Sequence, residues 1–330
     1  MGKMIAGAGA AAMLVASMAV AQQRERLPAE CRQEIVKLCR GAEGGFRSCI
    51  RSALPKLSDS CRKAIGDRGA SAPPAPGTRE LAYGADPKQR LDLLVPSDST
   101  RAPLLLFVHG GGWSIGDKRT GAGAKAAHFT EAGWAFASVN YRLVPQATVE
   151  QQGADIAAAI AWARSNAARH GLDPEKVVLM GHSAGAHLVA LVGTDPRYLA
   201  AAGVPLGAVK GVILLDGAGY DIAGQMAQPG NAAAGMYDAA FGKDVARQNA
   251  LSPTLHAAVP NASNWLILPV ARRADSTAQS NALAAALSKA GARATVTPVP
   301  DSNHRKLNRG LGGDGDFATG EVDKFLAGLR

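Results

Sequence analysis

Two glycine-rich stretches most constrain how this chain can fold, because each follows a short apolar run of strand type. The first is His109-Gly110-Gly111-Gly112-Trp113, which follows residues 104–108. The second is Gly181-His182-Ser183-Ala184-Gly185, which lies between a strand-like run at 177–180 and a helix-like run at 184–192. Glycine lets the backbone turn sharply and approach its neighbours closely. The pair therefore predicts a glycine-rich loop after one strand and a strand-to-helix turn after another.

The chain from Thr78 onward alternates apolar strand-like runs with helix-like ones. Such a pattern is typical of an α/β domain, with a mostly parallel sheet covered by helices on both faces. Strands are expected at 104–108, 134–139, 177–180, 209–215, 265–270 and 294–299, and helices at 155–168, 184–192, 278–290 and 321–329. The Ala/Gly/Gln-rich stretch 223–263 is a candidate cap over a site.

The first 21 residues have the pattern of a secretory signal peptide. Lys3 precedes an apolar, uncharged run, Met4–Val20, and Ala19-Val20-Ala21 supplies the small residues of a cleavage site. This pattern predicts a secreted or periplasmic protein. A membrane anchor is the alternative, but the run is short and rich in Ala and Gly, which gain little from lipid.

A small cysteine-rich region is expected at residues 22–69. It holds all four cysteines, Cys31, Cys39, Cys49 and Cys61, and an even number in an exported chain predicts disulfides, with three pairings open. A zinc site is disfavoured because close C-x2-C pairs and a nearby histidine are missing. Helical periodicity over 29–65 predicts a helical hairpin that disulfides stabilise. A Pro/Ala linker, 70–77, leads to the main domain, 78–330.

The formal net charge is +9, and residues 22–70 hold eleven Lys/Arg against six Asp/Glu. This excess is expected to form a solvated basic face, with binding to an acidic envelope surface or a polysaccharide as the alternative. A nucleic-acid partner is not expected, because no nucleic-acid motif accompanies the charge.

The chemistry expected at the two stretches is acyl transfer to a serine. Ser183, in a G-x-S-x-G turn, is the predicted nucleophile, and a serine needs a base to take its proton. The main-chain amides of Gly110, Gly111 and Ala184 are the predicted donors to the oxyanion of the tetrahedral intermediate. No metal or cofactor is required for this chemistry.

The base is identified by elimination among the histidines after Ser183. His187 lies on the helix that follows the serine, and His256 lies inside the candidate cap, which leaves His304 after the last strand. The acid that orients it is predicted to be Asp275, which follows the strand at 265–270. Asp216 and Asp221, which follow the strand at 209–215, are the alternatives.

These residues resemble the α/β-hydrolase superfamily, in its esterase/lipase branch with an H-G-G-G-W loop and a G-H-S-A-G-A-H-L elbow. The resemblance covers residues 78–330 and includes Asn140-Tyr141-Arg142-Leu143-Val144-Pro145, Asp275 and His304. It implies a cofactor-free carboxylic ester hydrolase. One departure is that members often carry His-Gly before the acid, where this chain has Pro269-Val270-Ala271-Arg272. The cysteine spacing of the N-terminal region resembles the repeat of a Golgi cysteine-rich glycoprotein.

The resulting hypothesis is an exported serine esterase with a Ser183–His304–Asp275 triad, acting on a small-molecule or carbohydrate ester. An arylformamidase on the same fold is one alternative. A non-catalytic envelope- or carbohydrate-binding protein, in which the hydrolase domain is a relic, is the other.

Overall fold

The structure, a computed structural model, describes residues 28–39, 53, 56–62, 74–228, 233–258 and 260–329. The predicted signal peptide, Cys49 and residues 70–73 of the predicted linker lie outside these residues. Within them, no helix has both the length and the apolar character needed to cross a membrane.

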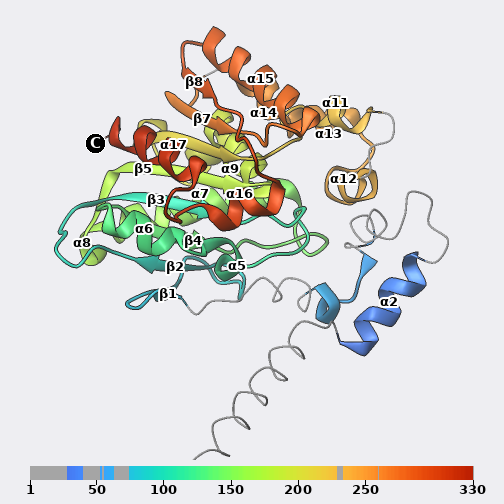
Figure 1. Ribbon diagram of the computed structural model, residues 1–330, viewed down its shortest axis with the longest axis horizontal. Helices are drawn as coiled ribbons and strands as arrows, with labels where there is room; N and C mark the ends of the chain where they lie inside the picture. Colours follow the sequence, from blue (N-terminus) through green and yellow to red (C-terminus); the bar gives the residue numbers. More distant parts are fainter. Residues whose placement is uncertain are drawn as a thin grey trace, which may run out of the picture.

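A sheet of eight strands forms the body of the molecule, in the order β1-β2-β4-β3-β5-β6-β7-β8 (Figure 1). The pairs β1–β2 and β2–β4 are antiparallel, and the other neighbours are parallel. The strands are β1 (Arg79–Ala82), β2 (Arg90–Leu94), β3 (Ala102–Val108), β4 (Ala135–Val139), β5 (Leu172–His182), β6 (Val209–Leu215), β7 (Asn264–Leu268) and β8 (Arg293–Val296). The predicted α/β fold with a mostly parallel sheet is confirmed.

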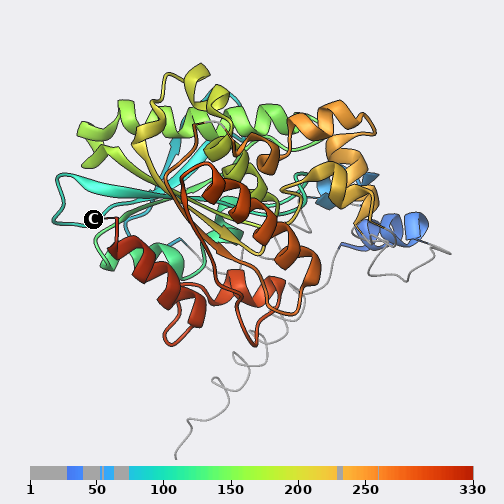
Figure 2. The same cartoon turned by 90° about the horizontal axis from the view of Figure 1, so that it is seen from above.

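Two layers of helices cover the sheet, and Figure 2 shows α7 on one side and α17 on the other. One face carries α7 (Val149–Ser165), α8 (Ala167–His170), α9 (Ala184–Thr194), α10 (Pro196–Ala201), the short 3-10 helix η2 (Leu206–Ala208) and α15 (Ala274–Lys289). The opposite face carries α5 (Lys118–Ala122), α6 (Lys125–Glu131), α16 (His304–Gly310) and α17 (Phe317–Ala327). Each layer buries its own apolar core against the sheet.

Strand β3 shows why the central strands are apolar throughout. Leu104, Leu106 and Val108 belong to the core beneath α7 and α9, whereas Leu105 and Phe107 belong to the core beneath α6 and α17. Successive side chains of a strand point to opposite faces, so a strand covered on both faces needs an apolar residue at every position.

Several element boundaries differ from those expected. Helix α7 begins at Val149 rather than at residue 155, because Thr148 and Gln151 form a reciprocal capping box at its start. The antiparallel strands β1 and β2 were not predicted. Most of β1 is exposed, so it lacks the apolar pattern that marks the central strands.

The helices of the predicted cap lie at the carboxyl ends of the strands. They are α11 (Ile222–Met226), α12 (Ala234–Phe241), α13 (Val245–Ala250) and α14 (Pro253–His256). Tyr237 and Phe241 of α12 extend the apolar core beyond the sheet. The cap is therefore packed onto the body through aromatic side chains.

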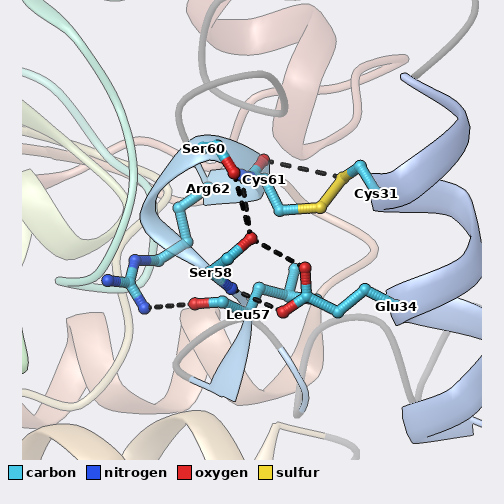
Figure 3. The surroundings of a disulfide bond; sticks show 7 residues. All are labelled: Cys31, Glu34, Leu57, Ser58, Ser60, Cys61 and Arg62. Carbon is cyan, nitrogen blue, oxygen red and sulfur yellow. Dashed lines mark hydrogen bonds between the residues drawn. A yellow bond between two sulfur atoms is a disulfide. The ribbon is translucent and has the colours of Figure 1, made fainter.

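A disulfide between Cys31 and Cys61 joins α2 (Ala29–Cys39) to residues 56–62 (Figure 3). Cys39 is also disulfide-bonded. Glu34 adds a second link, because its carboxylate accepts hydrogen bonds from the Ser58 amide at 2.6 Å and the Ser58 hydroxyl at 2.7 Å. The structure thus selects the Cys31–Cys61 pair among the pairings that the sequence left open.

This N-terminal module, defined here as residues 28–62 where described, contacts the body at the loop after β3. Its buried residues, including Ile35, Leu57 and the disulfide, pack against Ile115. Gln146 of the body also donates a hydrogen bond to Asp59 of the module, at 3.1 Å.

Candidate active site

Ser183 occupies the turn between β5 and α9, in a backbone conformation that residues with side chains seldom adopt, φ 57° and ψ −122°. Its amide donates to the Leu215 carbonyl of the neighbouring strand β6, at 3.0 Å. The flanking glycines are required by space. A Cβ on Gly181 would lie 2.3 Å from the Gly185 carbonyl oxygen, and a Cβ on Gly185 would lie 2.2 Å from the Val108 carbonyl oxygen.

The glycine loop after β3 lies directly against this turn. A Cβ on Gly110 would lie 2.8 Å from the His182 carbonyl oxygen and 2.9 Å from the Ser183 Cβ. Gly111, with φ +129°, leaves no room for a side chain either, since a Cβ there would lie 1.9 Å from the Ile115 carbonyl oxygen. Gly111 and Ala184 both line the pocket that contains Ser183. The predicted donor residues are therefore gathered beside the serine.

Buried aromatic residues hold this glycine loop in place. The imidazole of His109 stacks on Tyr141 with ring centroids 4.5 Å apart, and the Tyr141 hydroxyl donates to the His109 carbonyl at 3.0 Å. Burial lowers the pKa of His109 to about 4, so the ring is neutral at ordinary pH. His109 is thus a structural residue of the loop, and Tyr141 of the Asn140–Pro145 motif supports it.

Trp113 is the last residue of the glycine loop, and hydrogen bonds hold both its backbone and its indole ring in place. The Trp113 carbonyl accepts from the Gln152 side chain at 2.8 Å, and its indole donates to His187 Nδ1 at 3.2 Å. His187 Nε2 in turn lies 2.9 Å from the Leu251 carbonyl oxygen. His187 is buried and fully engaged here, which agrees with its exclusion as the base.

His304 is the first residue of α16, a helix capped by the Asn303 side chain. It lines the same pocket as Ser183. Its Nδ1 lies 2.7 Å from the Asp216 carboxylate, whose side chain is fully buried. The structure therefore brings Ser183, His304 and Asp216 to one pocket, from the carboxyl ends of β5, β6 and β8.

The structure pairs His304 with Asp216, one of the two alternatives from the sequence, and not with the predicted Asp275. Arg273 lies between the two carboxylates, donating to Asp216 at 2.7 Å and to Asp275 at 2.9 Å. Asp275 thus bonds to the guanidinium rather than to the imidazole. Asp216 is better placed because it follows Leu215, the residue whose carbonyl binds the Ser183 amide.

Asp216 is held in its ionised form by its neighbours. Burial alone would raise the pKa of Asp216, but the hydrogen bond with His304 and the charge of Arg273 outweigh it. The Val270 amide adds a third stabilising contact at 2.9 Å. Together they hold the pKa of Asp216 well below its usual range.

His182 contacts both the imidazole and the backbone carbonyl of His304. The two rings lie 4.5 Å apart between centroids, and His182 Nε2 is 2.9 Å from the His304 carbonyl oxygen. Burial and the neighbouring His304 hold the pKa of His182 well below its usual value, so the ring is neutral. A neutral His182 with Nε2 protonated donates to that carbonyl and fixes the start of α16.

The remaining candidates lie outside this arrangement. Asp221 caps α11, where it accepts from the Gly224 amide at 3.0 Å. His256 Nε2 lies 2.9 Å from the Ala250 carbonyl oxygen, on the cap. Asp155 forms an ion pair with Arg142 at 2.6 Å, with its own side chain buried. The described residues contain no group of three or more His, Cys, Asp or Glu side chains able to hold a metal ion.

The pocket encloses about 700 Å³ and opens between the glycine loop, the cap and α15. Its lining includes an apolar wall of Trp113, Met236 and Tyr237 and a charged wall of Arg272, Arg273 and Asp275. Trp113 meets Tyr237 edge to face with ring centroids 5.2 Å apart. The sequence did not point to Arg273, Met236 or Tyr237, because none of them lies in a motif.

The strand order of the sheet, the helices on both of its faces and the turn at Ser183 together define an α/β-hydrolase fold. Two solved structures share it: esterase 2 from Thermogutta terrifontis (TM-score 0.62, 23% identity, covering 78% of this chain and 94% of that one) and esterase B from Lactobacillus Rhamnosis (TM-score 0.66, 21% identity, covering 86% and 96%). At this identity the likeness concerns the fold.

The sequence comparisons are more particular but cover less of the chain. The BD-FAE family model matches residues 91–200, which include the glycine loop and the Ser183 turn. The chain is similar to a probable isoprenylcysteine alpha-carbonyl methylesterase of Oryza sativa (42% identity over 113 residues, 34% of this chain and 26% of the relative). It is also similar to esterase LipC of Mycobacterium tuberculosis (38% over 127 residues, 37% and 32%).

The matched part of the chain thus spans about a quarter to a third of these curated relatives. Asp216, Arg273, Asp275 and His304 all lie beyond the residues that the family model matches. The shared region is the part that carries the predicted nucleophile and the predicted oxyanion loop.

Proposed function

We propose that this chain is a serine carboxylic ester hydrolase that forms an acyl-enzyme on Ser183. One observation carries the proposal: a single pocket brings together a serine on a strained turn, a glycine loop and a histidine bonded to a buried carboxylate. Similarity to named esterases across the matched region gives independent support.

In the acylation step, Ser183 Oγ attacks the ester carbonyl carbon while His304 takes its proton. Asp216 accepts the Nδ1–H of His304, which leaves Nε2 unprotonated to serve as the base. The tetrahedral intermediate then collapses, the C–O bond to the alcohol breaks, and the imidazolium returns the proton to the leaving alkoxide.

The oxyanion of the intermediate is stabilised by the amides of Gly110, Gly111 and Ala184. Amides that are fixed in place before the reaction stabilise developing charge without any reorganisation. The supports of the loop, Tyr141 and Gln152, provide this rigidity. Ala184 is the first residue of α9, so the N-terminal end of that helix adds its favourable field.

Deacylation repeats the sequence with water as the nucleophile. His304 removes a proton from the water, the resulting hydroxide adds to the acyl carbon, and the carboxylic acid leaves as Ser183 recovers its proton. Asp216 stays ionised throughout because its pKa is strongly lowered.

We expect the substrate to carry a short acyl group, which would lie against the apolar lining residues Trp113, Met236 and Tyr237. The Thermogutta terrifontis esterase 2 has been solved with propionate and with butyrate bound, which agrees with this size class. We expect hydrolysis of p-nitrophenyl acetate, propionate and butyrate to exceed that of the octanoate.

The test combines hydrolysis with active-site labelling. The chain is assayed on p-nitrophenyl esters, acetylated xylan and N-formylkynurenine, and is labelled with a fluorophosphonate. Ser183→Ala is expected to abolish labelling and to reduce turnover by about 10⁵-fold or more, with Ser302→Ala as the control. Hydrolysis of formylkynurenine alone would move the function to the arylformamidase alternative. A folded protein that neither cleaves esters nor takes the label would overturn the proposal.

Export to an oxidising compartment is part of this proposal. The Cys31–Cys61 disulfide supports it, since disulfides persist mainly outside the cytosol. The apolar run Met4–Val20 supports it as well. Cell fractionation with N-terminal sequencing of the mature protein tests it, and a cytosolic protein that retains residues 1–21 would contradict it.

A further inference from the structure

Arg273 places a positive charge beside the histidine of the proposed triad. Its Nη1 is 3.0 Å from His304 Nδ1 and 2.7 Å from the Asp216 carboxylate, and its Nη2 is 2.9 Å from Asp275. One cation thus contacts both the acid and the base, while a second carboxylate holds it from the far side. The esterase mechanism proposed above assigns no role to this group.

The contact between Arg273 and His304 sets up a competition for Nδ1. A guanidinium can only donate hydrogen bonds, so it binds Nδ1 only when that nitrogen carries no proton. The ionised Asp216 can only accept, so it binds Nδ1 only when the proton is present. The Asp216 contact is shorter by 0.3 Å, 2.7 Å against 3.0 Å, and pairs opposite charges once the imidazole is protonated. Asp216 therefore keeps the productive tautomer.

The remaining effect of Arg273 on His304 is electrostatic. A cation 3.0 Å from the ring disfavours the imidazolium, whereas the buried Asp216 carboxylate favours it. Arg273 is 30% exposed and Asp275 is 35% exposed, so both charges act through a partly screened environment. Asp275 partly neutralises Arg273 and so weakens its effect.

Other titratable and charged groups lie on the elements next to His304. His182, at the end of β5, contacts the ring but is neutral. Lys125 of α6 donates to the Asn308 carbonyl at the other end of α16. Arg272 donates to the Ser302 carbonyl at 2.7 Å, in the loop before α16. On the same loop and helix lie Asp301, Arg305 and Lys306. Arg273 differs from these cations because its Nη1 contacts the imidazole directly, 3.0 Å from His304 Nδ1.

We propose that Arg273 is a positioning residue that extends the proposed hydrolase activity to lower pH, by opposing protonation of His304, and that Asp275 tempers this effect. The proposal rests on the esterase function stated above. It assigns a role to Arg273, which directly follows the Pro269–Arg272 stretch where members of the resembling branch often carry His-Gly.

The test is the pH profile of kcat/KM for p-nitrophenyl acetate in wild type, Arg273→Gln and Arg273→Lys. Arg273→Gln removes the cation and keeps an amide donor, so its acid limb is expected to move to higher pH by about one unit. Arg273→Lys keeps the charge and is expected to retain most of the wild-type profile. Arg101→Gln also removes one positive charge. It is the control because Arg101 directly precedes β3, whereas the glycine loop of the pocket follows the other end of that strand.

Asp275→Asn provides a test of opposite sign. It removes the carboxylate that neutralises Arg273, so its acid limb is expected to move to lower pH, by less than the Arg273→Gln shift. If Arg273 and Asp275 acted only in folding, the acid limbs of the Arg273→Gln and Asp275→Asn profiles would not move in opposite directions. Titration of the His304 ring by ¹⁵N NMR gives a readout that does not depend on turnover.

The outcomes separate this inference from the proposed function. A wild-type enzyme with Ser183-dependent activity, together with an unmoved acid limb in folded Arg273→Gln, would overturn the role of Arg273 and leave the esterase proposal intact. An equal shift in Arg273→Lys would also overturn it, because that variant keeps the charge. Loss of Ser183 dependence in the wild type would instead overturn the esterase proposal itself.

Discussion

The side of the pocket proposed to bind the oxyanion and the side proposed to carry out acid–base chemistry are held in place by different interactions. On the first, the oxyanion side, residues 109–113 and 181–185 meet through backbone contacts so close that glycine is required. On the second, the acid–base side, the side chains of Asp216, Arg273, Asp275 and His304 are joined by hydrogen bonds and ion pairs. The first is fixed by shape and the second by a balance of charges, so they should respond differently to substitution and to pH.

Among the substitutions that test this comparison, the largest effect is expected from Asp216→Asn, which removes the central charge of the acid–base side. The amide cannot hold the productive tautomer of His304 as the carboxylate does, and Arg273 loses its buried partner. We expect kcat to fall by about 10³–10⁴-fold, measured on p-nitrophenyl acetate at neutral pH. Asp221→Asn, a change of the rival acid on the cap, is the control and should stay close to wild type.

The next largest effect is expected from Gly110→Ala on the oxyanion side. The added methyl would lie 2.8 Å from the His182 carbonyl oxygen and 2.9 Å from the Ser183 Cβ, so loop and serine must separate. Displacing one oxyanion donor costs about 10²–10³-fold in kcat. The pH profile should keep its shape, because no charge changes.

Gly320→Ala serves as the matched control for that substitution. Gly320 lies on α17, where a Cβ would meet nothing within 4 Å. Its activity should equal that of the wild type, and its thermal midpoint should rise slightly, because alanine favours a helix over glycine. A Gly110→Ala enzyme with full activity would contradict the view that close packing fixes the oxyanion side.

A smaller effect on turnover is expected from Asp275→Asn. This carboxylate bonds Arg273 rather than His304, so we expect kcat at neutral pH to change by less than about tenfold. A loss as large as that of Asp216→Asn would restore Asp275 as the triad acid and contradict the arrangement described here. Paired assays of the two variants under one condition decide between them.

The smallest effect on turnover is expected from the Cys31→Ser/Cys61→Ser double variant. The disulfide stabilises the N-terminal module, by about 2–4 kcal/mol, and lies outside both sides of the pocket. We expect the module to become sensitive to limited proteolysis while kcat changes by less than about threefold. Ser60→Ala, an exposed change in the same module, is the control. Unchanged resistance to protease would show that the disulfide is not needed there.

The same division explains how much the sequence could predict. The oxyanion side consists of two contiguous motifs, so Gly110, Gly111, Ser183 and Ala184 were located by local pattern alone. The sheet was equally accessible, because strands such as β3 and β6 are apolar at nearly every position. Both are properties of neighbouring residues in the chain.

The acid–base side depends on contacts across long sequence separations. Asp216 and His304 are 88 residues apart, and Arg273 and His304 are 31 apart. Family pattern favoured Asp275, but one arginine two residues earlier binds that carboxylate and leaves Asp216 with the imidazole. No local sequence pattern shows which of two aspartates will contact a histidine and which will instead be bound by an arginine.

Ile115 belongs both to the rim of the pocket and to the surface on which the N-terminal module rests. A protein shortened to begin after the linker would expose the Ile115 side chain to water beside the opening of the pocket. Apolar surface uncovered at such a point favours self-association. A shortened protein prepared for crystals or for assays would therefore benefit from a polar residue in place of Ile115, or from keeping residues 22–77 in place.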